Sequence, residues 1–524
     1  MLEGLESRLL LDGNVTALVA AGNLFVYGDA NDNDIIIEQG LTNPDEFSIM
    51  GRVGTGTTVN GTAEDTRVGF AGVTRGIWAW LAGGDDAVKL DDAAVPGTIW
   101  VDHGTGNSTT DIDPTTVGGD VWVWCGSGLD TFSLTGGTVA GRLSLYNGAG
   151  GSNTTLTDTS VTGSVVVISG VGSEQFTLNN AGGGTGVGGD LVIANGSGGS
   201  TTALVDTTVG GNASVTSGDG TNNFTLDNAS SGTGVVGSLS VINGAGGGTL
   251  SLSDTQVGRD TTIITGGGDD QVSIDPTTVG RDMVILTGAG NDQLTLGQVT
   301  VTRNLVMDTG AGDDQLTIDD TSVGGVTQIW TGPGWTAGTD DDTVNVETAD
   351  VAATASTFTS LFCLYTGGGA DAVTLGGDGA NDMIAFGGTA IGDGGAGTDT
   401  LNAMNHGNTG MNPALFFNFE DEAPIIDNQT LTSVDENSTN GTVVGTVAAS
   451  DPDAGDTLTY TITGGNTGDA FAINASTGEV TVNSQAALDF ETTPIFNLTV
   501  QVEDSGGLTD DATVTINLND ITEP

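Results

Sequence analysis

The hydrophobic residues of this chain fall in short alternating runs, separated by turns rich in glycine, aspartate and threonine. One representative segment has an apolar pair, a single apolar residue and a second pair: Val272 and Ile274, Val279, then Met283 and Ile285. Alternation over four or five positions is typical of a β-strand with one buried face. The pattern therefore predicts three short strands in each such segment.

The same pattern recurs at a period of 22 residues. One position of the repeat is always valine, and these valines are Val73, Val95, Val117, Val139, Val161, Val187, Val209, Val235, Val257, Val279, Val301 and Val323. Nine of the eleven intervals are 22 residues, and the other two are 26 because of a Gly-rich insertion. A fixed period of this length predicts stacked coils. We expect an all-β fold with a parallel β-helix (a β-solenoid of 22-residue coils) that has three narrow faces; a flattened roll of two sheets is the alternative.

Longer alternating strands, such as TLTYTIT and FNLTVQVED, replace the glycine pattern at about Pro424 and predict a Greek-key β-sandwich. The chain then divides into five parts. Residues 1–13 form an N-terminal motif, and residues 14–58 form a β cap, which a solenoid needs because an open end exposes unpaired strand edges. Residues 59–330 form the solenoid, residues 331–422 its irregular end, and residues 423–524 the sandwich.

The charge of the chain limits its partners. Its 524 residues include 67 Asp and Glu against 9 Lys and Arg, a formal net charge of −58. Nucleic acids and anionic membrane surfaces are excluded because both require clustered cations. No apolar run is long enough to span a membrane. Arg303 is the last basic residue, so the carboxylates that follow must face water, be protonated or bind metal ions.

Many of the aspartates recur in G-x-G-x-D turns. Glycine permits positive φ and exposes carbonyl oxygens, and aspartate adds a carboxylate; both are ligands that calcium prefers. These turns resemble the repeat-in-toxin nonapeptide G-G-x-G-x-D-x-U-x, most closely in GGAGTDTLN from Gly394. The predicted calcium ligands are Asp270, Asp292, Asp314, Asp371 and Asp399. The alternative is a solvated Asx turn that caps a strand.

The carboxy-terminal sandwich resembles a cadherin repeat of the kind found in bacterial surface proteins. The motifs VDEN, SDPDAGD, TGEVTV, LDFE, VEDSGGL and LNDITEP occur in the expected order. The resemblance implies calcium at two ends of the domain. Asp451, Asp453 and Asp504 would face the preceding linker, where EDEAP (420–424) resembles a degenerate linker. Glu436, Asp489, Glu491, Asn519 and Asp520 would face a following domain.

Two features depart from the cadherin pattern. Phe490 stands where the family has arginine, and Asn517 replaces an acidic linker residue. The sequence shows no following domain, so we expect the second site to be incomplete in this chain or completed by another molecule. The alternative is that these acids only make the sandwich soluble.

Outward positions of the first coils carry an aromatic set that recurs with the 22-residue period: Trp78, Trp80, Trp100, Trp122, Trp124 and Tyr146. An exposed aromatic strip is suited to flat sugar faces or to a partner protein. In the alternative, residues 14–58 or a loop fold over it as part of the cap.

The first residues, LEGLESRLLLDG, are similar to an LE-x-R-x-LL motif near the start of large planctomycete surface proteins, although no standard signal peptide is visible. We therefore expect a calcium-binding structural or adhesion protein of the bacterial surface or matrix. The solenoid would be a spacer, and the cadherin-like domain would bind itself or other surface proteins. Polysaccharide is a further candidate partner.

Two other functions remain as alternatives. End-to-end stacking of solenoids would make the chain a self-assembling filament or layer subunit. A β-helix enzyme that degrades polysaccharide is disfavoured because the rod has few basic residues and no pair of carboxylates stands out among so many. We predict no catalytic residues.

Overall fold

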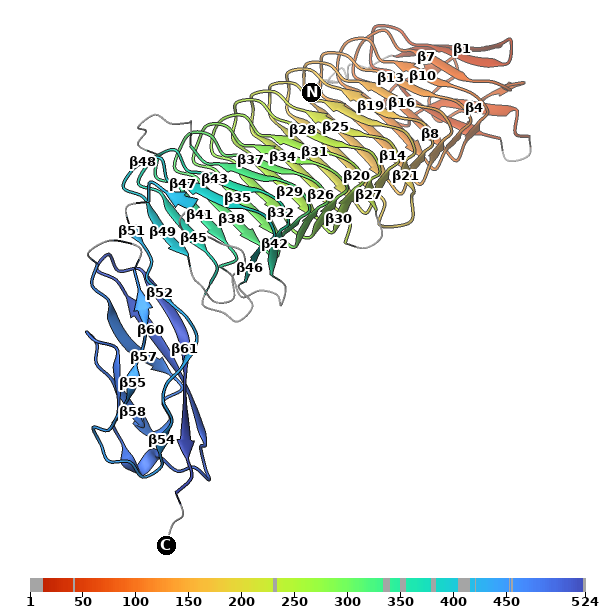
Figure 1. The fold of residues 1–524 in the computed structure, drawn as a ribbon. Coiled ribbons are helices and arrows are strands. Elements are labelled where there is room, and N and C mark those ends of the chain that lie inside the picture. Colours follow the sequence, from red (N-terminus) through yellow and green to blue (C-terminus); the bar gives the residue numbers. More distant parts are fainter. Residues whose placement is uncertain are drawn as a thin grey trace, which may run out of the picture. The chain divides into compact units, whose positions relative to one another are not determined.

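The computed structural model describes residues 13–40, 43–229, 233–332, 340–348, 355–377, 383–403, 415–419, 421–451, 453 and 456–521. The chain divides into two compact units, residues 1–289 and residues 290–524. Almost all of its regular structure is β-strand (Figure 1).

Unit 1 consists of stacked coils, and each coil gives one strand to each of three parallel sheets. The first face is formed by β7 (Ile77–Trp80), β10 (Ile99–Asp102), β13 (Val121–Trp124), β16 (Leu143–Tyr146), β19 (Val165–Ile168), β22 (Leu191–Ala194), β25 (Ala213–Thr216), β28 (Leu239–Ile242), β31 (Thr261–Ile264) and β34 (Met283–Leu286). The second face is formed by β8 (Asp86–Asp91), β11 (Ser108–Asp113), β14 (Asp130–Thr135), β17 (Ser152–Thr157), β20 (Glu174–Asn179), β23 (Ser200–Val205), β26 (Asn222–Asp227), β29 (Thr249–Ser253) and β32 (Gln271–Ile274).

The third face has the shortest strands: β9 (Ala94–Val95), β12 (Thr116–Val117), β15 (Thr138–Val139), β18 (Ser160–Val161), β21 (Gly186–Val187), β24 (Thr208–Val209), β27 (Gly234–Val235), β30 (Thr255–Val257) and β33 (Thr277–Val279). Neighbouring coils pair in parallel with equivalent residues opposite each other, as in Ile99 with Val121 and Val117 with Val139. This register confirms the three-faced β-helix, and the two-sheet roll is wrong.

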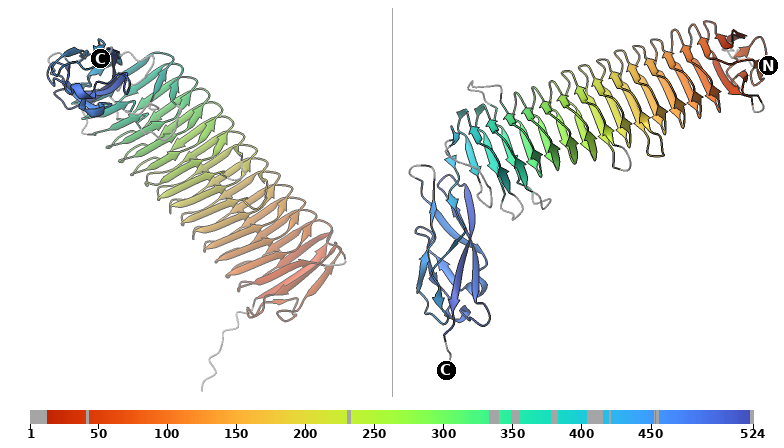
Figure 2. Two further views of the ribbon diagram at one scale, coloured as in Figure 1. Left: turned by 90° about the horizontal axis from the view of Figure 1, so that it is seen from below. Right: turned by 45° about the vertical axis from the view of Figure 1, so that its right-hand side comes forward.

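Six strands cover the first coil of unit 1 (Figure 2). They are β1 (Asn14–Ala20), β2 (Asn23–Tyr27), β3 (Asp34–Gln39), β4 (Glu46–Gly51), β5 (Thr58–Val59) and β6 (Val68–Ala71). The pairs β1–β2, β3–β4 and β4–β6 are antiparallel, and β5 pairs in parallel with β1. The strands β2 and β3 also pair in parallel with β7 and β8 of the first coil. The edge of the stack is therefore hydrogen-bonded within the chain.

Unit 2 begins with coils of the same kind. Its first face contains β37 (Leu305–Asp308), β40 (Thr327–Trp330), β43 (Phe362–Tyr365), β47 (Ala390–Asp393) and β50 (Phe416–Phe417). Its second face contains β35 (Gln293–Gly297), β38 (Gln315–Asp319), β41 (Thr343–Val346), β45 (Ala372–Leu375), β49 (Thr400–Ala403) and β51 (Asp421–Glu422). Its third face contains β36 (Val299–Val301), β39 (Ser322–Val323), β42 (Ser356–Phe358) and β46 (Ile384–Phe386), and β44 (Gly368–Gly369) pairs with β48 (Ala396–Gly397).

A β-sandwich forms the rest of unit 2. One sheet contains β53 (Gln429–Thr430), β54 (Val434–Asp435), β57 (Thr459–Gly464), β60 (Ile495–Glu503) and β61 (Thr509–Asn519), and the other contains β55 (Val443–Thr446), β58 (Phe471–Ile473) and β59 (Glu479–Val482). The pair β52 (Ile425–Ile426) and β56 (Ala449–Ser450) and two 3₁₀ turns, η2 (Thr467–Asp469) and η3 (Gln485–Ala487), complete it. Phe471 and Phe496 pack edge to face in its core.

The coils bury the residues that the sequence pattern places inward. All twelve valines of the repeat are at most 2% exposed. Tight turns between strands require glycine where coils approach closely: Gly266 and Gly288 have φ of 93° and 105°, and a Cβ on Gly288 would collide with the carbonyl oxygen of Gly266. Among the residues that the structure describes, no helix is long and apolar enough to cross a bilayer.

Inward and outward residues of one strand should differ in their effect on stability. Leu134 of β14 is fully buried, whereas the adjacent Thr135 is exposed. We expect Leu134→Ala to lower the free energy of unfolding by about 2–5 kcal/mol, because it leaves a cavity between coils. The matched change Thr135→Ala should alter it by less than about 0.5 kcal/mol. Chemical denaturation measures both, and equal effects would contradict the assigned register.

Candidate metal centre

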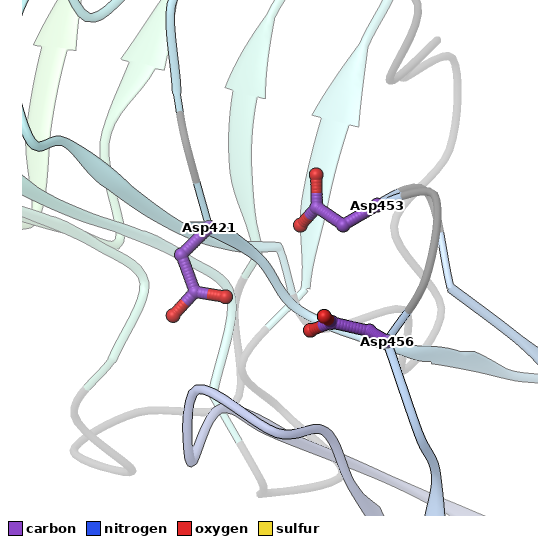
Figure 3. Close-up of side chains that lie close together, drawn as sticks. All are labelled: Asp421, Asp453 and Asp456. Atoms are coloured by element: carbon purple, nitrogen blue, oxygen red, sulfur yellow. The ribbon is translucent and has the colours of Figure 1, made fainter.

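Two overlapping groups of carboxylates lie where the solenoid coils of unit 2 lead into the sandwich. Asp421 lies on β51, which pairs in parallel with β49 of the last coil. Its carboxylate lies within 4.8 Å of those of Asp453 and Asp456, in the loop after β56 (Figure 3). Carboxylate atoms of Asp451, Asp456 and Asp504 also lie within 4.8 Å of one another. Asp456 belongs to both groups, so the five acids make one site, which we call the proximal cluster.

Main-chain amides hold the proximal cluster in place. The amide of Glu422 donates to Oδ2 of Asp453 at 2.6 Å, and the amide of Asp453 donates to Oδ1 of Asp451 at 2.9 Å. Asp504 Oδ1 accepts the amides of Gly507 at 2.7 Å and Leu508 at 2.8 Å. The carboxylates are therefore oriented by backbone from both sides of the site.

The electrostatics of the proximal cluster favour a cation. Burial, followed by the negative charges of Asp453 and Asp451, raises the pKa of Glu422 to about 7. Burial and neighbouring carboxylates also raise the pKa values of Asp421 and Asp451. Within the described residues, Oδ2 of Asp451 and Oδ2 of Asp504 are buried and have no hydrogen-bond partner. Crowded carboxylate oxygens of this kind fit calcium, a hard cation with oxygen ligands.

Gly506 makes the approach of Asp421 possible. A Cβ at Gly506 would collide with the carboxylate of Asp421. A side chain at this position would therefore displace Asp421 from the proximal cluster. Gly506 is the first glycine of the VEDSGGL motif, so the motif contributes space as well as the ligand Asp504.

A second, distal cluster lies at the other end of the sandwich. It joins carboxylates of Glu436, Glu491 and Asp520 within 4.8 Å. Glu436 is buried, and its two oxygens accept the amides of Phe490 at 3.0 Å and Ile521 at 2.8 Å. The other two acids are exposed. This cluster has one fixed carboxylate and two that face solvent.

The structure brings together most, but not all, of the predicted cadherin-type ligands. Asp489 instead accepts the amide and hydroxyl of Thr492, and Asn519 donates to Asp435 at 2.9 Å. The predicted ligands omitted Asp456, although it is the last residue of the SDPDAGD motif. Glu420 and the N-terminal motif, apart from Gly13, lie outside the described residues.

Part of the chain matches a known domain family. The cadherin domain family matches residues 430–519, so the chain ends in a cadherin domain. The protocadherin-like wing polarity protein stan of Drosophila melanogaster is 44% identical over 88 residues, which are 17% of this chain and 2% of that protein. Cadherin-23 of Rattus norvegicus is 48% identical over 75 residues, 14% of this chain and 2% of that protein.

Part of the chain is also similar to solved cadherin structures. The ectodomain of human desmocollin-1 is 33% identical and covers 20% of this chain and 21% of its own, with a TM-score of 0.18. A three-repeat fragment of mouse cadherin-23 is 29% identical and covers 19% of this chain and 33% of its own, with a TM-score of 0.17. The chain matches only a small part of the length of these relatives.

The predicted calcium ligands of the solenoid turns are buried, which the solvated-turn alternative did not anticipate. Asp270, Asp292, Asp314, Asp371 and Asp399 are each at most 1% exposed. In unit 2, an Oδ1 atom accepts the amide of the equivalent aspartate one coil earlier in four cases: Asp314, Asp342, Asp371 and Asp399. The amide of Asp292 donates to Asp314 at 2.8 Å, and the amide of Asp371 donates to Asp399 at 2.9 Å. The solvated-turn interpretation is therefore wrong. Calcium binding at these turns stays a prediction.

Unit 1 has polar residues at the same inward coil position, but serines separate its acids. Ser108 donates to Asp130 at 2.8 Å, and Ser152 donates to Glu174. The equivalent residues in unit 2 are Asp292, Asp314, Asp342, Asp371 and Asp399, with an acid in every coil. The charge of this buried acid column is therefore concentrated in unit 2.

Asp342 is not among the predicted ligands because an insertion interrupts the 22-residue period before it. A local signal was present: each buried acid stands two residues before the first inward apolar residue, as Asp342 does before Val344. Period-two alternation places both on the inner face of the strand. The same rule places Asp270 with Val272 on one inner face.

The buried acid column predicts a pH effect on stability. Burial, only partly offset by hydrogen bonds from the preceding coil and from threonine hydroxyls, raises the pKa of Asp314 to about 7, Asp342 to about 8 and Asp371 to about 6. The folded protein therefore holds more protons than the unfolded chain between about pH 4 and 8. In the presence of chelator, the melting temperature should fall as the pH rises through this range.

Asp342→Asn tests this cause, because it removes one of the raised carboxyl groups. The slope of melting temperature against pH should become shallower in Asp342→Asn and stay unchanged in Asp313→Asn, whose side chain is exposed. Thermal melts followed by circular dichroism between pH 5 and 8 measure the slopes. If both variants keep the slope of the parent chain, the buried acid column is not the cause of the pH dependence.

Proposed function

We propose that this chain is an extracellular, calcium-dependent adhesion protein of a cell surface or matrix, with a non-enzymatic role. The proximal cluster carries the proposal: five acidic residues converge in a stretch that contains no lysine or arginine. The match to cadherin and protocadherin proteins supports adhesion as the role of this domain. The stacked coils would act as a spacer that holds the adhesive domain away from its anchoring point.

In this proposal, calcium would be held by carboxylates of Asp421, Asp451, Asp453, Asp456 and Asp504. When bound, it would neutralise their mutual repulsion and provide a rigid ionic link between their loops. The chain's own contribution is orientation: the amides of Glu422 and Asp453 fix two carboxylates before any ion arrives, and Gly506 leaves room for Asp421.

The distal cluster supports a role for contacts between molecules. Glu436 is pinned by two amides, whereas Glu491 and Asp520 are exposed to solvent. A cation held by these three residues would have ligand positions open to another molecule. The same arrangement favours the second candidate function, a subunit of a filament or layer, if the other molecule is a copy of this chain.

Calcium should stabilise the protein because it binds the folded clusters more tightly than the unfolded chain. We expect excess calcium, relative to chelator, to raise the melting temperature of the sandwich, and Asp453→Asn to reduce that rise. Glu479→Gln is the matched control, since Glu479 is an exposed acid of β59 outside both clusters. Differential scanning calorimetry of the full chain measures the shift. An identical rise in Asp453→Asn would contradict calcium binding at the proximal cluster.

The distal cluster makes a separate prediction about association. Calcium should increase the sedimentation coefficient of the full chain, or aggregate beads coated with it, and Glu491→Gln should weaken this effect. The side chain of Glu491 is exposed, so in the presence of chelator the variant should keep the melting temperature of the parent chain. If association needs calcium but is unchanged in Glu491→Gln, the contact between molecules does not involve the distal cluster and lies on another surface.

A further inference from the structure

The outward side of the first face in unit 1 carries an aromatic surface. Register places Phe25, Trp78, Trp100 and Trp122 in one row, and Tyr27, Trp80, Asp102, Trp124 and Tyr146 in the next. Trp124 and Tyr27 are each 42% exposed, and the other tryptophans are half-buried. The described residues of the cap extend this surface with Phe25 and Tyr27 instead of covering it, so the expected covering by residues 14–58 is wrong for them.

The outward residues of the second face can be compared with those of the first face in the same coils. Its outward residues are polar, for example Lys89, Asp111 and Ser133 on consecutive strands β8, β11 and β14. Both faces belong to the same coils and bury the same kind of core. The aromatic residues are thus a property of one outer surface, and the folding of the coils does not require them.

Ring contacts divide the aromatic surface into two groups. Tyr27 stacks on Trp80 with ring centroids 5.4 Å apart, and Trp100 stands edge-on to Trp80 at 5.1 Å. In the other group, Trp124 stacks on Tyr146 at 4.0 Å with an interplanar angle of 10°. These contacts restrict the conformations of the rings. A ligand would therefore bind a preorganised surface, and binding would cost little additional side-chain entropy.

A groove of about 460 Å³ lies between the two groups. Its apolar lining consists of Trp78, Trp100, Trp122 and Trp124, and Thr98 and Asp120 supply its polar groups. Among the described residues, the indole nitrogen Nε1 of Trp100 is buried and has no hydrogen-bond partner. The groove therefore combines apolar ring surfaces with a hydroxyl and a carboxylate, while the buried indole nitrogen of Trp100 is not offered to a ligand.

We propose that this groove binds a neutral polysaccharide. The apolar faces of sugar rings pack against indole rings, while their hydroxyl groups can donate to Asp120 and exchange hydrogen bonds with Thr98. Asp120 in the groove, and Asp102 in the second row of the aromatic surface, repel anionic chains, which selects an uncharged sugar over an acidic one. This binding site is independent of both carboxylate clusters.

A peptide partner fits the groove less well. Extended peptides commonly bind by adding a strand to a free sheet edge. Here β10 and β13 pair with each other and with β7 and β16 on either side, so their main-chain groups are already used. Recognition must come from side chains alone, and those present match a ring with an apolar face and a hydroxylated rim.

Affinity electrophoresis of the full chain tests the proposal, with gels that contain hydroxyethyl cellulose, xyloglucan, galactomannan or the anionic polysaccharide alginate. We expect retardation by at least one neutral polysaccharide and none by alginate. The double variant Trp122→Ala/Trp124→Ala should bind at least about tenfold more weakly. The control Ile168→Ala/Ile242→Ala removes two exposed apolar residues from the same face and should bind as the parent chain does.

Three results would overturn the proposal. One is the absence of retardation by every neutral polysaccharide, in gels and on a glycan array. Another is equal weakening in the tryptophan and isoleucine variants, which would indicate general apolar adhesion. The third is binding of alginate or of a proline-rich peptide in place of a neutral glycan. Thermal melts of both double variants, which should match the parent chain, separate a lost binding site from a lost fold.

Discussion

The parallel hydrogen-bond ladder between coils is the interaction on which the rest of the solenoid depends. Within each unit it pairs every residue of a strand with the equivalent residue of the next coil, as Val121 pairs with Leu143. Equivalent residues are then separated by a single strand spacing, about 4.8 Å. A residue type that recurs with the period therefore becomes a continuous column. The valine column, the aromatic surface and the buried acid column all result from this one constraint.

The same ladder makes like charges neighbours, which is unfavourable inside a protein. Unit 1 reduces the problem by alternating acids with serine donors, as in Ser108 and Asp130. Unit 2 stacks aspartate on aspartate, with main-chain amides as donors, and burial then raises the pKa values of Asp314 and Asp342. Neutral acids or bound cations are the two physical solutions, and they have opposite pH dependence because protons compete with metal ions for carboxylates.

Periodicity made the fold predictable, since the valine spacing gives the coil length and the three apolar spots give the number of faces. The carboxy-terminal motifs likewise predicted the cadherin domain. They also predicted that Asp451, Asp453 and Asp504 lie together at the end of the domain that faces the preceding linker. The direction in which the individual acidic and amide side chains point could not be predicted from the motifs. The alternative of a solvated turn implied exposure for Asp270, although its spacing from Val272 places it inward. Asp489 and Asn519 match motif positions, but local hydrogen bonds to Thr492 and Asp435 use their side chains otherwise.

Asp421 connects the proximal cluster to the strand ladder of the coils, which ligands from the sandwich loops alone would not do. It is part of β51, whose pairing with β49 makes it the last strand of the second face, while its carboxylate meets those of Asp453 and Asp456 in the cadherin domain. A cation at this site would bind an element of the coil ladder and the loops of the sandwich at once. Force on the adhesive domain would then pass through ionic bonds to a ladder strand as well as through the connecting chain. Removing calcium would leave mutually repelling carboxylates at the same point, so the junction should loosen before either the coils or the sandwich unfolds.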